Sequence, residues 1–274
     1  VRRVAEWTLL RTRRDPNRLM FLLIPVFVVV SQLLGGIVQT GRVGPMLAPV
    51  CAVVLPWLAG VLFAMNPLGD EGAMLPTTLI AAPGRQYVRG LVLPGLVFGL
   101  AVVLAAAAVA AVVAPYTLLE GVGLVALAAY LTCVSAALAP AVGMALPRFS
   151  AISVGQSRAV LPPRLSAVAA HIATTAVPGA ALAALLLVPR LARAALAGLV
   201  GFLPAVLLGI VADGAGPLAS AAGWFTEVGG AVQALPTVPF QRGGGVVLLV
   251  GGVVAAGLAY RYAVGRFERY SPVE

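Results

Sequence analysis

Few side chains in this 274-residue sequence are of the types that carry covalent or metal chemistry. There is one histidine, His171, and the two cysteines, Cys51 and Cys133, lie far apart in apolar runs. No lysine occurs, which excludes a P-loop, whose lysine contacts nucleotide phosphates, and Schiff-base catalysis, which needs a lysine amine. We therefore predict that the chain is not an enzyme: it has no catalytic residue, metal ligand or cofactor, and does not hydrolyse ATP by itself.

The polar and helix-breaking residues with the most informative spacing lie in one stretch, residues 66–90. Two adjacent acids there, Asp70 and Glu71, precede a short helix predicted at 72–82, and negative charge is favourable at a helix N-terminus. The candidate contact residues of this stretch are Asn66, Pro67, Gly69, Asp70, Glu71, Gly72, Arg85 and Arg89. We predict a capped helix held parallel to a membrane between two spans; an ordinary long polar turn is the alternative.

The composition indicates what kind of protein must position these residues. Apolar residues make up 61% of the sequence and charged residues 10%, whereas globular domains carry about 25% charged residues. A soluble fold of this length could not cover its surface with so few charges. Disordered and nucleic-acid-binding proteins need many more solvated charges. We predict an integral membrane protein that contacts membrane lipid and no nucleic acid.

Six apolar segments are long enough to cross a bilayer, which takes a helix of about 20 residues. None of them contains an acidic residue. They are Leu19–Val38, Met46–Met65, Leu91–Ala114, Gly121–Leu146, Ser166–Val188 and Gly243–Tyr262. Each is predicted to be helical, because backbone polar groups must be satisfied within a segment in lipid and none of these segments alternates like a barrel strand.

A seventh apolar run, Ala194–Ala212, is followed by a weaker one, Gly214–Leu235, which contains Glu227 and five glycines. Two full crossings and a re-entrant hairpin both fit this pair of runs. The predicted fold class is therefore all-α: a polytopic transmembrane helix bundle of six firm spans plus a paired or re-entrant segment.

The distribution of the 18 arginines predicts the orientation. With a cytoplasmic N-terminus, and with 194–235 leaving and returning on one side, 14 arginines lie inside and 4 outside. Cytoplasmic loops show this excess of basic residues. A single crossing by Ala194–Ala212 would weaken the excess to 11 against 7. Both termini are therefore predicted to be cytoplasmic, and so is the loop Pro147–Leu165, which we expect to be irregular.

The first 18 residues carry six arginines. Val4, Ala5 and Thr8 fall on one side at helical spacing, so 1–18 is predicted to be a basic amphipathic interfacial helix, followed by a transmembrane domain at 19–274. Its candidate surface residues are Arg2, Arg3, Arg11 and Arg14. The alternative is that these arginines only set the topology. Their position ahead of a long apolar run also argues against a cleavable signal peptide.

The order of these parts resembles the permease subunit of ABC-2 type exporters. The shared order is a basic amphipathic helix, two spans, a cytoplasmic helix, three spans, a pair of shorter outer segments and a last span. Two local motifs, RDPNRL at 14–19 and NPLGDEG at 66–72, look similar to haloarchaeal ABC-2 permeases. The resemblance covers most of the chain.

This resemblance implies a multi-pass exporter subunit in a prokaryotic cell membrane. Its partners would be a separate ABC ATPase subunit and a second permease copy or homologous half. Residues 66–82 would be the coupling helix, with the helix at 1–14 beside the ATPase. The segments within 194–235 would match re-entrant half-helices, and the chain could itself be the C-terminal half of a fused permease.

Two other classes stay open. An ion-coupled secondary transporter usually places carboxylates or histidines inside its spans, whereas the six firm spans hold no carboxylate and His171 lies near the predicted cytoplasmic end of its span. A non-transporting membrane assembly protein is compatible with the composition. Co-purification with an ATPase subunit would separate the exporter from both.

Overall fold

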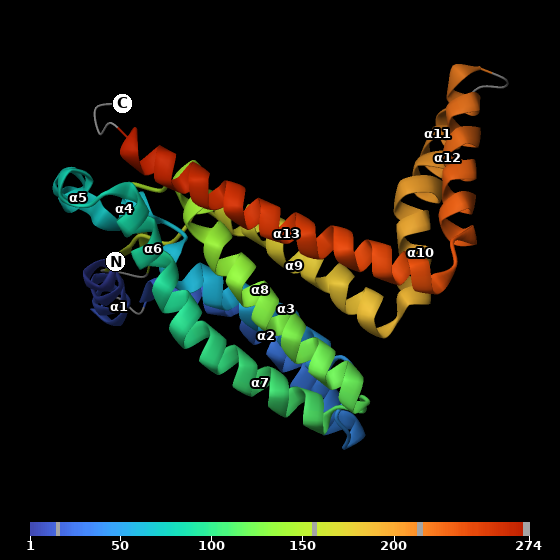
Figure 1. Ribbon diagram of the computed structural model, residues 1–274, viewed down its shortest axis with the longest axis horizontal. Helices are drawn as coiled ribbons and strands as arrows, with labels where there is room; N and C mark the ends of the chain where they lie inside the picture. The colour runs from blue at the N-terminus through green and yellow to red at the C-terminus, as the bar shows by residue number, and fades with distance from the viewer. Residues whose placement is uncertain (15–16, 155–157, 213–215, 271–274) are drawn as a thin grey trace. The chain divides into compact units, whose positions relative to one another are not determined.

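The computed structural model describes residues 1–14, 17–154, 158–212 and 216–270, and the regular secondary structure of this part of the chain is helical apart from one short pair of strands (Figure 1). It divides into two compact units, each considered by itself below. The first unit comprises Val1–Ala180 and Gly251–Glu274, and the second comprises Ala181–Val250.

Six helical segments of the described chain are long and apolar enough to cross a membrane. They are Leu47–Ala64, Gly84–Val113, Leu118–Ala145, Leu165–Leu187, Pro189–Val211 and Thr237–Glu268. The first predicted span, Leu19–Val38, lies within the helix α2 (Asn17–Thr40), of which Val26–Thr40 forms a shorter apolar stretch. The predicted all-α transmembrane helix bundle is confirmed, and the chain is a multi-pass membrane protein.

Five of the predicted firm spans correspond to helices with nearby or longer bounds. They are α3 (Leu47–Ala64), α8 (Leu118–Ala145), α9 (Leu165–Leu187), α13 (Thr237–Glu268) and the composite of α6 (Gly84–Pro94), a π-turn (Gly95–Gly99) and α7 (Leu100–Val113). The π-turn directly follows Pro94, which removes one backbone hydrogen bond and so favours a local change of helical pitch.

The core of the first unit is built by close contact of α3, α7 and α8. Gly60 of α3 lies directly against Ser135 of α8, whose hydroxyl donates to the Trp57 carbonyl at 3.3 Å. Gly95 and Gly99 lie against Ala59 of α3. Small residues let helix backbones approach closely where lipid supplies no hydrophobic driving force between spans.

Within the paired segment at 194–235, residues 194–211 and 217–234 are helical. α10 (Pro189–Ala197), a π-turn (Gly198–Phe202) and α11 (Leu203–Val211) form one continuous helical segment, and α12 (Pro217–Ala234) packs beside it (Figure 1). Gly201 and Gly229 bring the two backbones into contact. The first of these segments is long enough to span, and the assignment of the pair as re-entrant stays a prediction.

The loop Pro147–Leu165 is not wholly irregular, so that expectation was wrong. β1 (Ile152–Val154) pairs antiparallel with β2 (Arg158–Val160), placing Ile152 opposite Val160. The β-branched residues in both segments favour extended backbone, and pairing satisfies their peptide groups.

Candidate functional site

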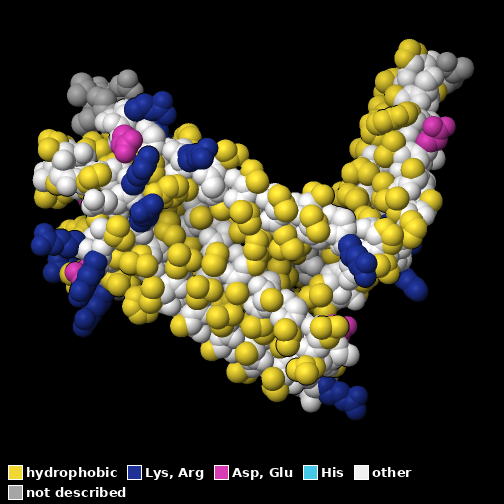
Figure 2. All heavy atoms as spheres, viewed as in Figure 1, with side chains coloured by type: hydrophobic (Ala, Val, Ile, Leu, Met, Phe, Trp, Pro, Cys, Tyr) yellow, Lys and Arg dark blue, Asp and Glu magenta, His cyan; other side chains and the backbone are white. Residues whose placement is uncertain are grey.

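The residues singled out by sequence gather at one end of the first unit. We call this the α1–α5 end; it comprises α1 (Arg2–Arg14), residues 66–90 and the last two turns of α13 (Figure 1). Residues 66–90 contain α4 (Pro67–Glu71), a 3₁₀ turn (Gly72–Met74), α5 (Leu75–Ala81) and the start of α6. Figure 2 shows dark-blue arginine side chains at this end and apolar side chains covering the spans.

The helix predicted at 72–82 is present as the 3₁₀ turn and α5, and a further helix, α4, precedes it. α4 begins at Pro67, since a proline at the first position is pre-set for helical φ and needs no hydrogen-bond donor. It ends at Gly72, whose φ of +53° favours glycine. Asp70 and Glu71 therefore lie in α4, directly before the 3₁₀ turn.

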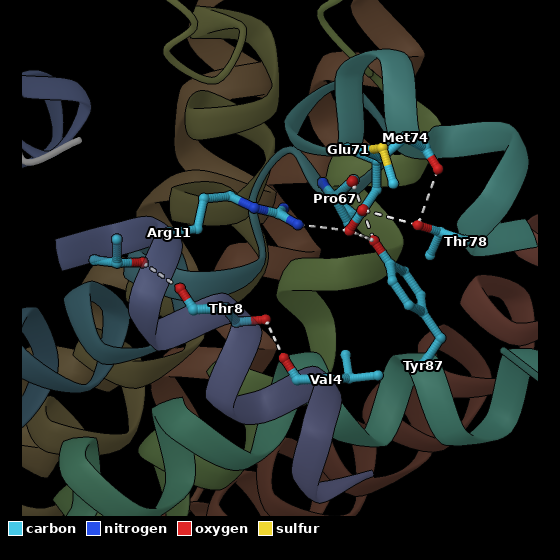
Figure 3. A network of polar contacts seen from close by, with 9 residues as sticks. Val4, Thr8, Arg11, Pro67, Glu71, Met74, Thr78 and Tyr87 are labelled. Atoms are coloured by element: carbon cyan, nitrogen blue, oxygen red, sulfur yellow. Dashed lines mark hydrogen bonds and ion pairs between the residues drawn. The ribbon is translucent and has the colours of Figure 1, made fainter. Parts of the chain in front are cut away.

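Glu71 forms the centre of a buried polar network (Figure 3). One carboxylate oxygen, Oε1, accepts from Arg11 Nη2 at 2.7 Å and from the Tyr87 hydroxyl at 2.9 Å. The other, Oε2, accepts from the Thr78 hydroxyl at 3.0 Å. The Glu71 side chain is only 3% exposed and that of Arg11 15%. One carboxylate thus connects α1, α4, α5 and α6.

Tyr87 extends this network to the last span. Its ring stacks on Phe267 of α13, with ring centroids 4.2 Å apart. Its hydroxyl lies 3.2 Å from the Pro67 carbonyl as well as near Glu71. Leu68, Leu91 and these two rings belong to one buried apolar cluster. The short helices between α3 and α6 are therefore fixed to the spans on several sides.

The start of this segment is held by a second set of contacts. Asn66 donates through Nδ2 to the Arg148 carbonyl at 3.0 Å, and the Arg148 amide donates to Asn66 Oδ1 at 2.9 Å. A Cβ on Gly69 would overlap the same Arg148 carbonyl. Asn66, Pro67 and Gly69 are all buried, so these candidate contact residues pack inside the protein.

The other candidate residues lie at the surface to different degrees. Gly72, Arg85 and Arg89 are exposed, while Asp70 is half-buried. Arg89 donates through Nε to the Tyr260 hydroxyl of α13 at 3.1 Å. The structure thus brings the acid Glu71 to Arg11 of α1, a pairing across 60 positions that spacing in the sequence does not reveal.

The predicted amphipathic character of α1 is present, and its buried face packs on the protein. Ala5 and Thr8 are buried, and Val4 lies against Gly90 of α6 so closely that a Cβ there would be 2.5 Å from the Val4 Cβ. The opposite face exposes Trp7 and Leu10.

The helix α1 spans Arg2–Arg14, and residues 15–16 of the predicted 1–18 helix lie outside the described residues. The exposed face is suited to a membrane interface. Its arginines are exposed at Arg2, Arg3 and Arg14 and half-buried at Arg11.

The sequence analysis missed the exposed apolar surface of the 3₁₀ turn and α5. Leu75 is buried, whereas Met74 and Ile80 point outward and Ile80 is 89% exposed. Apolar residues between two predicted spans were the available signal, but spacing alone did not divide them into buried and exposed sets. Such exposed side chains on a short helix outside the spans are a candidate contact surface for a partner.

His171 lies near the start of α9 and is fully buried within the protein. Its Nε2 lies 3.1 Å from the Ser135 carbonyl, between α9 and α8. In the described ranges, no group of three or more His, Cys, Asp or Glu side chains is placed to hold a metal ion.

We compared the chain with protein-family models, with curated proteins and with solved structures, and it matches none of them.

Proposed function

We propose that this chain is the membrane-spanning permease subunit of an ATP-binding cassette exporter in a prokaryotic cytoplasmic membrane. A separate ATPase chain would supply the energy, and a second permease copy or homologous half would complete the pathway. The observation that carries the proposal is the Glu71 network, which joins a short helix outside the spans to three other elements of the first unit.

The network gives α5 the mechanical property that a coupling element needs. Thr78 of α5 and Tyr87 of α6 bind the same carboxylate, and Tyr87 stacks on Phe267 of α13. A displacement of α5 is therefore transmitted to two spans rather than absorbed by a loose loop. Rigid-body motion of packed helices is a common way to convert a local event into a larger rearrangement.

The exposed side of α5 supplies the contact surface for the ATPase. Ile80 and Met74 present apolar surface there. With the arginine-rich α1–α5 end in the cytoplasm, as the positive-inside rule favours, this surface faces the compartment that holds ATP. The chain has no lysine for a P-loop, so hydrolysis belongs to the partner.

Replacing Ile80 with Asp is expected to weaken ATPase association while leaving the chain folded. The side chain is 89% exposed, so the change removes contact area without opening the core. Affinity purification of the full chain from its native membranes should yield ATPase activity with the wild-type protein. With Ile80→Asp, the co-purified ATPase activity should fall by tenfold or more, because a loss of about 1.4 kcal/mol of binding energy lowers affinity tenfold.

Leu118→Asp is the matched control. Leu118 is 86% exposed but begins α8, at the opposite end of the first unit (Figure 1). Its substitution should leave the co-purified ATPase activity unchanged. Wild-type preparations without ATPase activity, or transport driven by an ion gradient alone, would contradict the proposal and favour the secondary-transporter class.

A further inference from the structure

A basic pocket lies between the ends of α6 and α13 in the first unit. Its volume is about 710 Å³, within the roughly 300–1,000 Å³ of ligand pockets. Its chemistry is set by Arg85, Arg89, Tyr260, Arg261, Val264 and Glu268. Three guanidinium groups and one carboxylate give these side chains a formal charge of +2, so the pocket favours an anion.

The polar groups of the pocket are suited to phosphate oxygens. Arg89 Nε donates to the Tyr260 hydroxyl oxygen at 3.1 Å, which orients the guanidinium on the pocket wall. The Tyr260 hydroxyl accepts this bond, so its own hydrogen can donate to a bound oxygen. Arg85 and Arg261 add two planar forks that match phosphate geometry. Glu268 also lines the pocket, and its side chain packs against Gly84.

The position of the pocket favours the phosphate group of a lipid over a free phosphate ion. The pocket lies at the ends of two helices long enough to span a membrane, and so at headgroup level. From Arg261 toward the membrane interior, α13 exposes Leu258, Val254 and Val253. At Gly257, which lines the pocket on this side, an added Cβ would meet no atom within 4 Å. An open, apolar path for acyl chains thus leads away from the basic groups.

We propose that this pocket binds the phosphate of an anionic phospholipid, with its acyl chains lying along α13. Basic pockets between the ends of transmembrane helices are suited to such headgroups. Free phosphate shares the headgroup chemistry but would gain nothing from the apolar surface of Val253 and Val254. The inference concerns a face of α6 and α13 that is separate from the exposed side of α5, and it does not depend on an ATPase partner.

The test measures binding of fluorescent phosphatidylglycerol and phosphatidylcholine to the full-length chain in detergent. The wild-type protein should prefer phosphatidylglycerol, and inorganic phosphate in tenfold excess should not displace it. Replacing Arg85, Arg89 and Arg261 with Gln should weaken phosphatidylglycerol binding by about 100-fold, since each arginine contributes roughly a factor of five. Arg266→Gln, on the exposed surface of α13 outside the pocket, should retain wild-type binding.

Thermal melting of each variant shows whether it is folded. If the triple variant is unfolded, Arg261→Gln alone replaces it, and we expect this single variant to bind phosphatidylglycerol about fivefold more weakly. Equal binding of the two lipids by the wild-type protein would overturn the proposal. So would an unchanged preference for phosphatidylglycerol in the folded variants, or displacement of the lipid by an equal concentration of inorganic phosphate.

Discussion

Replacing Glu71 with Ala is expected to lower the free energy of unfolding by about 3–5 kcal/mol, because removing one partner of a buried ion pair leaves the other charge uncompensated. Arg11 would lose its carboxylate at 2.7 Å, and the hydroxyls of Tyr87 and Thr78 would lose an acceptor. Glu71→Gln should cost less, since it keeps the shape and part of the hydrogen bonding. Reversible unfolding of the purified chain in detergent measures both.

Glu6→Ala is the matched control for this prediction. Glu6 also accepts from an arginine, Arg2, at 2.7 Å, but its side chain is 53% exposed. Its removal should change the free energy of unfolding by no more than about 1 kcal/mol. An Arg11→Met, Glu71→Gln double variant should be less destabilised than the sum of its single variants, because the two side chains contact each other. Equal effects of Glu6→Ala and Glu71→Ala would show that the network does not hold this end together.

Gly143→Ala is expected to cost about 1–3 kcal/mol, the usual range for overpacking a tightly packed interior. Gly143 lies in α8 against the end of α3, where an added Cβ would be 2.5 Å from the Met65 carbonyl oxygen and 2.7 Å from Pro67 Cδ. Backbone atoms and a proline ring cannot move aside as a flexible side chain can. The change should therefore separate α3 from α8 and displace the start of α4.

The same substitution at Gly36 separates this steric effect from helix propensity. Gly36 lies in α2, and a Cβ there would meet no atom within 4 Å. Gly36→Ala should be neutral or should stabilise by about 0.5–1 kcal/mol, because alanine favours helix. Unfolding of the two variants under one set of conditions makes the comparison. Equal free energies of unfolding for the Gly143→Ala and Gly36→Ala variants would contradict a close contact between α8 and Met65.

That the long apolar runs form helices could be predicted from the sequence because lipid imposes one rule on every span. Runs such as Gly121–Leu146 have no alternative to helix when their backbone groups must be satisfied internally. The short helices between α3 and α6 were less predictable, because single residues set where they begin and end. Pro67 begins the additional helix α4, and the positive φ of Gly72 separates α4 from α5.

The sequence singles out the segment 66–90, but it does not give the contacts that this segment makes. The sequence shows two acids at 70–71, and it does not show that one of them turns inward to Arg11 while α5 turns Ile80 outward. Which acid is buried depends on the docking of α1 and on Tyr87, both distant along the chain. Replacing both Asp70 and Glu71 with Ala would consequently mix a loss of stability with any loss of coupling, whereas Ile80→Asp changes only the exposed surface of α5.

Cross-linking from position 80 shows whether the exposed side of α5 contacts an ATPase. The chain would carry Ile80→Cys with Cys51 and Cys133 replaced by Ala, and a thiol-directed photo-cross-linker would be activated in native membranes. We expect labelling from the cytoplasmic side and a cross-linked product that contains a Walker A ATPase, while the same probe at Leu118→Cys yields none. Labelling of position 80 from the outside only, or a cross-linked product without an ATPase, would contradict the proposed contact.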